Sequence, residues 1–355
     1  MATPAPLVTV AVSTYASERL LGPCLEMLME QTLGDRLEVI VVDSGSPEDE
    51  RSVVEPFLAT GRVHYLRTER ETLYAAWGRA LTRARGRYFA NVNTDDWIAP
   101  HSLATLAEAL DTHPDCALAY ADWALSDTPH TAPRPESTVC VHTRWEPTLH
   151  LFYCYTGCVQ FWRRSALEAL GGHDPSLRYC GDLEVLRRLT EAGMRCVYVP
   201  EVLWGFFRNP DGLSLSTDGS TEEQRQVHRR ARQAVRIEQF YAVDPADSRA
   251  AADAWTALGV VAMRVKVPWL DAPTPDVDFA LDCFERALAL VPDHADALND
   301  RDAVRVSAGR RAETKSSLGR LGARRSAMRG TDLELRHADV EPARRGEVFV
   351  PARRP

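Results

Sequence analysis

Residues 37–50 read LEVIVVDSGSPEDE, a strand-like run followed by the start of a helix. The first part, residues 37–43, is rich in β-branched residues and has the length of a buried strand that ends on Asp43. Ser46 and the acidic residues after it form an N-cap signature, which predicts a helix over 46–60. One strand followed by one helix is the unit of an α/β fold.

The same unit recurs on both sides of this stretch. Further strand-like runs are LVTVAV at 7–12, VHYLRT at 63–68 and RYFANVN at 87–93. Helical patterns stand between them at 18–32, 46–60 and 73–84. Strands that alternate with helices of this length indicate βαβ units, so we expect an α/β fold with a mainly parallel sheet flanked by helices. Such sheets bind ligands beyond the carboxyl ends of their strands.

Composition and charge exclude several classes of protein. Apolar residues make up 45% of the chain and charged residues 26%, which is ordinary for a soluble globular protein. The start, MATPAPLVTVAV, has no basic region, and no window reaches the ~20 apolar residues of a membrane span. We therefore expect a cytoplasmic protein with no secretory signal and no integral membrane segment. The net charge of −8 argues against nucleic acid as a partner.

Carboxylates gather at the predicted strand ends. Asp43 ends one strand, and Asp95 and Asp96 end another in NVNTDDW. Two adjacent aspartates at such an edge are stabilised by a cation, and oxygen ligands imply Mg²⁺ or Mn²⁺. The natural second partner of these ions is a diphosphate, so a nucleotide-linked substrate is expected. The alternative is that Asp95 and Asp96 only cap the next helix.

The turn after the first strand carries no glycine-rich phosphate loop. It reads STYASE, which places Ser13, Thr14 and Tyr15 at the strand end. Tyr15 can stack on a base, the hydroxyls can hydrogen-bond, and Asp43 can accept from a base N–H or a ribose hydroxyl. These residue types therefore suit a nucleoside.

Three segments, 8–32, 37–50 and 73–100, resemble in order and spacing the nucleotide-sugar domain of family 2 glycosyltransferases. The segment TGCVQFWRRSALEALGGHDPSLRYCGDLEVLRRLTEAGMRCVYVPEVL (156–203) resembles the acceptor half of that family. The resemblance covers roughly residues 7–215 and implies the glycosyltransferase A-type fold.

The resemblance also implies roles for individual residues. It assigns the nucleoside contacts to Ser13, Thr14, Tyr15, Glu18 and Asp43. Asp95 is implied in nucleotide and metal binding, Asp96 in metal binding, and Asp182 as the general base that takes the acceptor proton. Further residues of the donor and acceptor loops are implied to be Asn93, Trp97, His173, Glu184, Arg208 and Ser214.

Three positions depart from the family pattern. Asn93 stands where the first acid of Asp-x-Asp is usual, Gly181 replaces the glutamate before the base, and Trp77 with Gly78 replaces an Arg-Asn pair. From position alone, Asp182 can also be read as a helix cap, since LEVLRRL follows it.

A second architecture begins near residue 250. The segment 280–310 resembles a junction between tetratricopeptide repeats, with Pro292 at the turn, and the insertion 266–278 interrupts the period. We expect these parts: 1–125, the nucleotide-sugar-binding half of the catalytic domain; 126–220, the acceptor-binding half; 221–249, a helical linker; 250–326, the repeat-like helices; and 327–355, a disordered tail.

The implied function is an inverting glycosyltransferase. It moves a sugar from a nucleoside diphosphate sugar to a small molecule or glycan, assisted by Mn²⁺ or Mg²⁺, with Asp182 as base. The alternative is a peptide or protein acceptor presented by the helical repeats, and a third hypothesis is a non-catalytic scaffold. We also expect the helical region to support a homo-oligomer.

Overall fold

The computed structural model describes residues 5–142, 144–154, 156–210, 212–213, 220–265 and 275–318, with only the backbone of 220, 221 and 310–318. Ser214 and the tail expected at 327–355 lie outside the described residues. The chain divides into two compact units, and the boundary lies between Ala231 and Arg232. The helical linker predicted at 221–249 spans this boundary.

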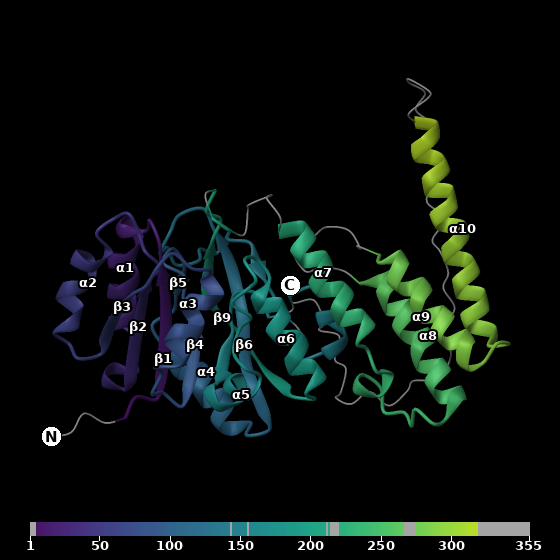
Figure 1. Ribbon diagram of the computed structural model, residues 1–355, viewed down its shortest axis with the longest axis horizontal. Helices are drawn as coiled ribbons and strands as arrows, with labels where there is room; N and C mark the ends of the chain where they lie inside the picture. Colours follow the sequence, from purple (N-terminus) through teal and green to yellow (C-terminus); the bar gives the residue numbers. More distant parts are fainter. Residues whose placement is uncertain are drawn as a thin grey trace. The chain divides into compact units, whose positions relative to one another are not determined.

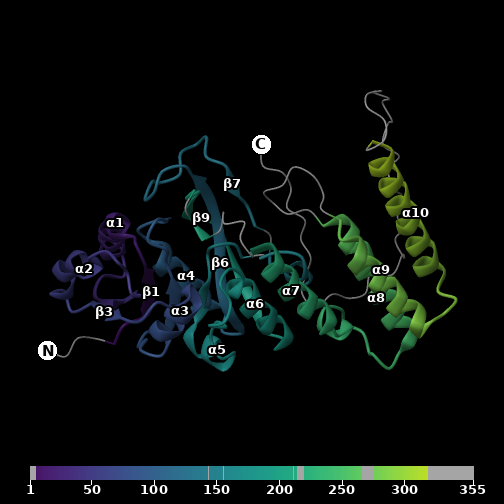
Figure 2. The ribbon, with the colours of Figure 1, turned by 45° about the horizontal axis from the view of Figure 1, so that its top comes forward.

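The first unit is built on one mixed sheet. Its strands lie in the order β3 (Val63–Arg67), β2 (Leu37–Asp43), β1 (Val8–Thr14), β4 (Tyr88–Asn91), β8 (Phe161–Arg163), β6 (Cys116–Ser126), β9 (Arg195–Phe207) and β5 (Trp97–Ile98), with β7 (Val139–Cys140) paired to β6. The first four strands are parallel, as are β6 and β9, whereas β8 is antiparallel to both of its neighbours. Figure 2 shows β7 near one end of the long β6. The predicted α/β class is confirmed.

Helices pack along this sheet (Figure 1). They are α1 (Glu18–Met29), α2 (Glu50–Leu58), α3 (Leu73–Leu81), α4 (Ser102–Thr112), α5 (Arg164–Ala169) and α6 (Gly181–Glu191), with short 3-10 turns at Gly34–Arg36 and Pro147–Leu151. Helix α7 (Ser220–Gln233) follows them and crosses the boundary between the units. Helix α3 lies against β1 and β2, and α4 against β6 and β9. The apolar side chains of β1 and β2, such as Val10 and Val41, are fully buried, as expected for a parallel sheet covered on both faces.

The helix predicted from Ser46 begins later than expected. Its first residue is Glu50, and Asp49 is the cap, because Asp49 Oδ1 accepts a hydrogen bond of 3.2 Å from the Ser52 N–H. The Ser46 N–H instead donates to Asp43 Oδ1 at 2.7 Å, and its hydroxyl donates to Glu50 Oε1. Because Ser46 is bound to Asp43 at the strand end, it forms part of the connecting loop. The helix therefore begins about one helical turn later than predicted.

The second unit is helical. It contains a 3-10 turn at Ile237–Gln239 and the helices α8 (Ser248–Arg264), α9 (Val277–Leu290) and α10 (Ala295–Leu318). Helices α8 and α9 lie side by side in both ribbon views (Figures 1 and 2). A Cβ on Gly259 would lie 2.5 Å from the Phe284 ring, so glycine is what allows these helices to approach closely. Buried His294 contacts Asp253 at 2.7 Å and ties the start of α10 to α8.

Within the residues that the structure describes, no helix combines the length and the apolar character needed to cross a membrane.

Candidate active site

Asp43 is fully buried at the end of β2, and the register of the sheet sets it beside Thr14 at the end of β1. Its Oδ1 accepts from the Ser46 N–H, and its Oδ2 accepts from the Tyr65 hydroxyl at 2.5 Å and from Arg67 Nη1 at 2.6 Å. Burial raises the pKa of Tyr65 to about 12, and the hydrogen bond to Asp43 adds to this shift. Asp43 is therefore an anchored anion, held by two residues of β3 that the sequence analysis missed. The signal was available, because Tyr65 and Arg67 end the next parallel strand.

The predicted nucleoside residues lie around the end of β1. Ser13 is half-buried, while Thr14 is buried and its Oγ1 has no hydrogen-bond partner among the described residues. Tyr15 is 41% exposed, and the guanidinium of Arg70 lies 3.3 Å from the centre of its ring, within cation–π range. Glu18 is exposed on the first turn of α1. The structure thus brings Ser13, Thr14 and Tyr15 together and adds Arg70, which the motif analysis did not include.

A cleft of about 420 Å³ adjoins this group. It is lined by residues 66–71, Arg79 and Arg83. Within it, Arg79 pairs with Glu71 at 3.1 Å, and Arg67 already bonds Asp43. The lining thus contains both arginines and glutamates, and Arg70 connects the cleft to Tyr15.

Asp95 and Asp96 lie in different environments. Asp96 is 1% exposed, and its Oδ1 accepts from the Phe207 N–H at 3.3 Å. Its Oδ2 accepts from Asn93 Nδ2 at 3.0 Å and from Trp204 Nε1 at 3.4 Å. Burial raises the pKa of Asp96 to about 7, and the charge of Asp95 adds to the shift. The predicted residue Asn93 therefore supports Asp96.

Asp95 is half-buried, and its Oδ2 accepts from Asn209 Nδ2 at 2.9 Å. Asn209 follows β9, which pairs with the short strand containing Trp97 through Trp97 and Gly205. A Cβ on Gly205 would lie 3.2 Å from that of Trp97, so the strands approach closely here. Predicted Trp97 thus helps hold the end of β9 beside the aspartates.

The donor set at Asp95 and Asp96 fits a hard cation. Neither carboxylate has an ion-pair partner among the described residues, and two adjacent carboxylates supply oxygen ligands alone. The described side chains contain no group of three or more His, Cys, Asp and Glu residues that could hold a metal. A cation here would therefore take its remaining ligands from a substrate diphosphate and from water.

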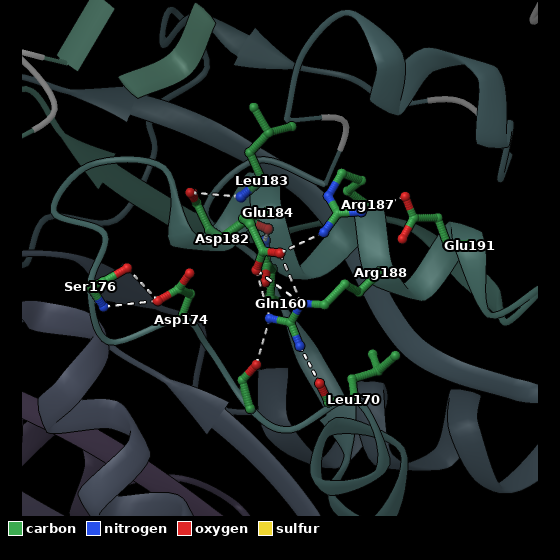
Figure 3. Close-up of polar contacts among 11 residues, drawn as sticks. Gln160, Leu170, Asp174, Ser176, Asp182, Leu183, Glu184, Arg187, Arg188 and Glu191 are labelled. Atoms are coloured by element: carbon green, nitrogen blue, oxygen red, sulfur yellow. Dashed lines mark hydrogen bonds and ion pairs between the residues drawn. The ribbon is translucent and has the colours of Figure 1, made fainter. Parts of the chain in front are cut away.

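Asp182 is half-buried in the first turn of α6 (Figure 3). Its Oδ1 accepts from the Leu183 N–H at 2.8 Å and from the Tyr74 hydroxyl at 3.2 Å. Its Oδ2 has a weak contact of 3.8 Å with the thiol of Cys154. Burial raises the pKa of Asp182. Cys180 occupies the N-cap position and has no side-chain cap bond, so Asp182 is not the N-cap residue of α6.

The turn before Asp182 is held by a residue that is distant in the sequence. Glu223, on α7, accepts hydrogen bonds from the N–H groups of Arg178, Tyr179 and Cys180 at 2.9, 2.6 and 2.7 Å. These N–H groups belong to the turn that leads into α6, and among the three that of Cys180 lies at the N-cap position. The sequence offered no local signal for Glu223, because the contact is made only in the folded chain.

Glu184 is 7% exposed and its carboxylate is fully engaged (Figure 3). Its oxygens accept from Arg187 at 3.0 Å and from Arg188 at 2.6 Å. Arg188 in turn donates to the carbonyl oxygens of Leu170 and of Gly172, the latter at 2.7 Å. Glu184 therefore links α6 to the turn at 170–172 and does not present a free carboxylate.

His173 lies behind the Asp182 region, packed among aromatic rings. It is 4% exposed, stacks on Tyr74 with ring centres 5.8 Å apart, and meets the edge of Trp77 at 5.1 Å. Burial lowers the pKa of His173 to about 3, and Arg188 adds to this shift, so its imidazole is neutral at pH 7. The structure assigns it to packing around Tyr74.

Arg208 is exposed and pairs with Asp127 at 2.5 Å, while its backbone N–H extends the pairing of β9 with β6. Its neighbour Asn209 is the residue that contacts Asp95. The structure thus brings Asn209, and not Arg208, to the aspartates. Nothing is described for Ser214.

Comparison with known proteins shows which family model and which proteins this chain resembles. Residues 9–171 match the model of Glycosyl transferase family 2. EpsH of Bacillus subtilis, named as a glycosyltransferase, is 28% identical over 187 residues, which cover 50% of this chain and 52% of EpsH. The glycosyltransferase GlyA of Streptococcus pneumoniae is 32% identical over 100 residues, 28% of this chain and 14% of GlyA. The chain thus spans about half the length of EpsH and far less of GlyA.

Among solved structures, TarS 1–349 of S. aureus matches with a TM-score of 0.56 at 15% identity, covering 97% of this chain and 100% of that one. The same TarS fragment in complex with UDP-GlcNAc also gives 0.56 at 15% identity, with 96% and 99% covered. At this identity the likeness concerns the fold alone. Residues 9–171 therefore carry a glycosyl transferase family 2 domain.

Proposed function

We propose that the protein transfers a sugar from a nucleoside diphosphate sugar to an acceptor, with inversion at the anomeric carbon and Asp182 as general base. The observation that carries this proposal is the asymmetric Asp182 carboxylate. Two donors occupy its Oδ1, and among the described residues its Oδ2 has only the weak thiol contact at 3.8 Å. One oxygen is thus held while the other is available to accept a proton.

The donor binds, in this proposal, at the ends of β1 and β2. The ring of Tyr15 and the guanidinium of Arg70 form a stacking surface for the base. Ser13 and Thr14 offer hydroxyls, and buried Asp43, fixed by Arg67, offers an anchored acceptor to the nucleoside. Glu18 contributes from the exposed first turn of α1.

Asp95 and Asp96 are the residues that would hold Mn²⁺ or Mg²⁺. When bound, such an ion neutralises charge that develops on the departing diphosphate. Half-buried Asp95 is the more accessible carboxylate, while Asp96 is fixed by three donors. Asn209 holds Asp95 in place through its amide.

In the proposed reaction Asp182 acts as a carboxylate. Its Oδ2 accepts the proton of the acceptor hydroxyl, thiol or amine as that group attacks the anomeric carbon on the face opposite the nucleotide. The bond to the diphosphate breaks with its electron pair leaving on the diphosphate oxygen. General-base help of this kind is worth ~10²–10⁴ in rate.

A small molecule or glycan is the proposed acceptor. A peptide acceptor is the second candidate, and the observation that favours it is the separate helical unit formed by α8, α9 and α10. Antiparallel helix pairs of this kind stack into peptide-binding arrays in repeat proteins. The proposed homo-oligomer would also form through this unit.

The proposal is tested with a panel of nucleoside diphosphate sugars, starting with UDP-GlcNAc, incubated with the full chain and Mn²⁺ or Mg²⁺. Release of the nucleotide is measured for the unmodified protein, for Asp182→Asn and for Asp115→Asn. Asp115 is a matched control because its surface carboxylate pairs with Arg195. Release that Asp182→Asn abolishes and Asp115→Asn retains supports the proposal. No release with any sugar leaves the scaffold hypothesis in its place.

A further inference from the structure

Tyr74 and Gly181 are far apart in the sequence and in contact in the folded chain. The Tyr74 ring, on α3, lies against the backbone of Gly181, the first residue of α6. A Cβ built on Gly181 would lie 2.6 Å from Cγ of Tyr74, a distance that real Cβ atoms do not reach. Glycine at 181 is thus required by the presence of this ring.

The hydroxyl of the same tyrosine reaches Asp182. It donates to Oδ1 at 3.2 Å, on the oxygen that also accepts from Leu183. Tyr74 is 3% exposed, and burial together with the charge of Asp182 raises its pKa well above the ordinary value. The hydroxyl therefore keeps its proton and remains a donor over the working pH range.

The ring of Tyr74 is braced on two sides. Trp77 meets it edge-on with ring centres 5.3 Å apart, and His173 stacks on it at 5.8 Å. All three side chains are buried. Such packing restricts the ring to one rotamer and so fixes the direction of the hydroxyl.

We propose that Tyr74 is a positioning residue for the general base, and that its hydroxyl holds Oδ1 of Asp182 so that Oδ2 faces the acceptor. Tyr74 itself undergoes no bond change. This inference rests on the proposed function, and it adds a residue on α3, in the donor half, that sets the geometry of the base on α6.

The groups that face Asp182 come from several elements. They are Tyr74 from α3, the thiol of Cys154 from the segment before β8, Cys180 from the preceding turn, and Glu223 of α7 on the backbone of Cys180. The hydrogen bond from Tyr74 lowers the pKa of Asp182, against the larger effect of burial. Removal of the hydroxyl therefore raises this pKa.

Tyr74→Phe tests the proposal because it keeps the ring and its packing. The matched control is Tyr88→Phe. Tyr88 is also buried, and its hydroxyl also donates to an aspartate, Asp111 at 2.6 Å, on another part of the sheet. Both variants lose one buried hydroxyl bonded to a carboxylate, so their structural cost is comparable.

Two measurements are made on the full chain. The first is the titration of the Asp182 carboxyl carbon by NMR with ¹³C-labelled aspartate, with the signal assigned by its absence in Asp182→Asn. The second is turnover with the nucleotide sugar that the panel identifies. For Tyr74→Phe we expect a raised Asp182 pKa, a fall in kcat of about tenfold at unchanged donor KM, and an acidic limb moved to higher pH. Tyr88→Phe should change none of these.

The inference is overturned if the pKa of Asp182 is the same in Tyr74→Phe as in Tyr88→Phe. It is also overturned if the pKa of Asp182 shifts in Tyr74→Phe while the turnover of that variant stays at that of the control. Turnover in Asp182→Asn equal to that of the unmodified protein is a different result. It removes the base itself, and with it both the proposed mechanism and this inference. Loss of turnover in Asp182→Asn with normal turnover in Tyr74→Phe removes only the inference.

Discussion

The carboxylate of Glu223 accepts a hydrogen bond of 2.7 Å from the backbone N–H of Cys180, two positions before Asp182. Two further N–H groups, those of Arg178 and Tyr179, donate to the same carboxylate. These three N–H groups lie in the turn that leads into α6, so Glu223 fixes that turn from α7. The segment just before the proposed base is therefore held by a residue that lies 43 positions after Cys180 in the sequence.

Replacement of Glu223 tests the contribution of this contact. Glu223→Ala leaves three N–H groups without their acceptor and should lower the free energy of unfolding by about 1–2 kcal/mol, while Glu223→Gln should lose less. Chemical denaturation measures both. Glu222→Ala is the control, because Glu222 is exposed and its partners among the described residues lie on its own helix. Equal stability of Glu223→Ala and Glu222→Ala would contradict the prediction.

The contact between Tyr74 and Gly181 predicts coupled mutations. Gly181→Ala should destabilise the protein by about 1–3 kcal/mol, because the new methyl group meets the tyrosine ring. The penalty should shrink when Tyr74→Ser removes that ring in the same chain, so the double-mutant cycle should show a favourable coupling. Thermal or urea unfolding of the four proteins gives the coupling. Additive effects would mean that the two residues do not compete for space.

The rate of sugar transfer should fall as the pH is lowered through the pKa of Asp182. The base must be deprotonated, and burial raises its pKa, so the acidic limb of kcat/KM should lie above ~4, the value of an ordinary aspartate. Activity is present above that pKa and lost below it. Asp182→Asn should lower turnover by at least ~10² with donor binding little changed. A limb at or below the ordinary aspartate value would contradict the assignment.

Arg70 is expected to serve the donor through Tyr15. Arg70→Ala removes the guanidinium that lies 3.3 Å from the ring centre and should raise the donor KM several-fold while kcat changes little. Arg195→Ala is the control, since Arg195 is an exposed arginine paired with Asp115. Steady-state kinetics with varied donor separate the two. Equal donor KM in both variants would remove Arg70 from the donor site.

A nucleoside diphosphate should stabilise the protein only together with a divalent cation. In the presence of Mn²⁺ or Mg²⁺, excess UDP should raise Tm, because ligand binding to the folded state adds RT ln(1 + [L]/Kd). Asp95→Asn should abolish this shift, since Asp95 is the accessible carboxylate of the pair. Asp115→Asn should retain it. The same Tm shift in EDTA would argue against a metal at Asp95 and Asp96.

Much of the fold was predictable because its signals are local. Buried strands such as 37–43 are short apolar runs, and helices such as α3 have a periodic apolar face, so the alternation of strand and helix predicted the α/β class. The carboxyl ends of neighbouring parallel strands meet at one edge, and this rule alone brought Thr14 and Asp43 together. The order of motifs predicted a resemblance to family 2 glycosyltransferases, and residues 9–171 match the model of that family.

The partners of the candidate site residues depended on the tertiary structure. Asp95 and Asp96 are identical in type and adjacent in sequence, yet one is half-buried and bonded to Asn209, and the other is buried among three donors. Glu184 is two residues from Asp182, yet its carboxylate is occupied by arginines of its own helix. Sequence shows which residues can ionise, but burial and hydrogen-bond donors set their state. Burial is decided in the folded chain, and the donors are local for Glu184 and distant for Asp95.

Gly181, which departs from the family pattern, also separates what the sequence shows from what only the tertiary structure shows. In the sequence, Gly181 is noticed only because it replaces the glutamate of the family pattern. Trp77 and Gly78 are noticed only because they replace an Arg-Asn pair. In the folded chain the Tyr74 ring fills the space beside Gly181, and Trp77 braces that ring. Local periodicity placed α3 and α6 in the sequence, whereas the space between side chains is defined only when the two helices pack, because close packing is a property of their shared surface.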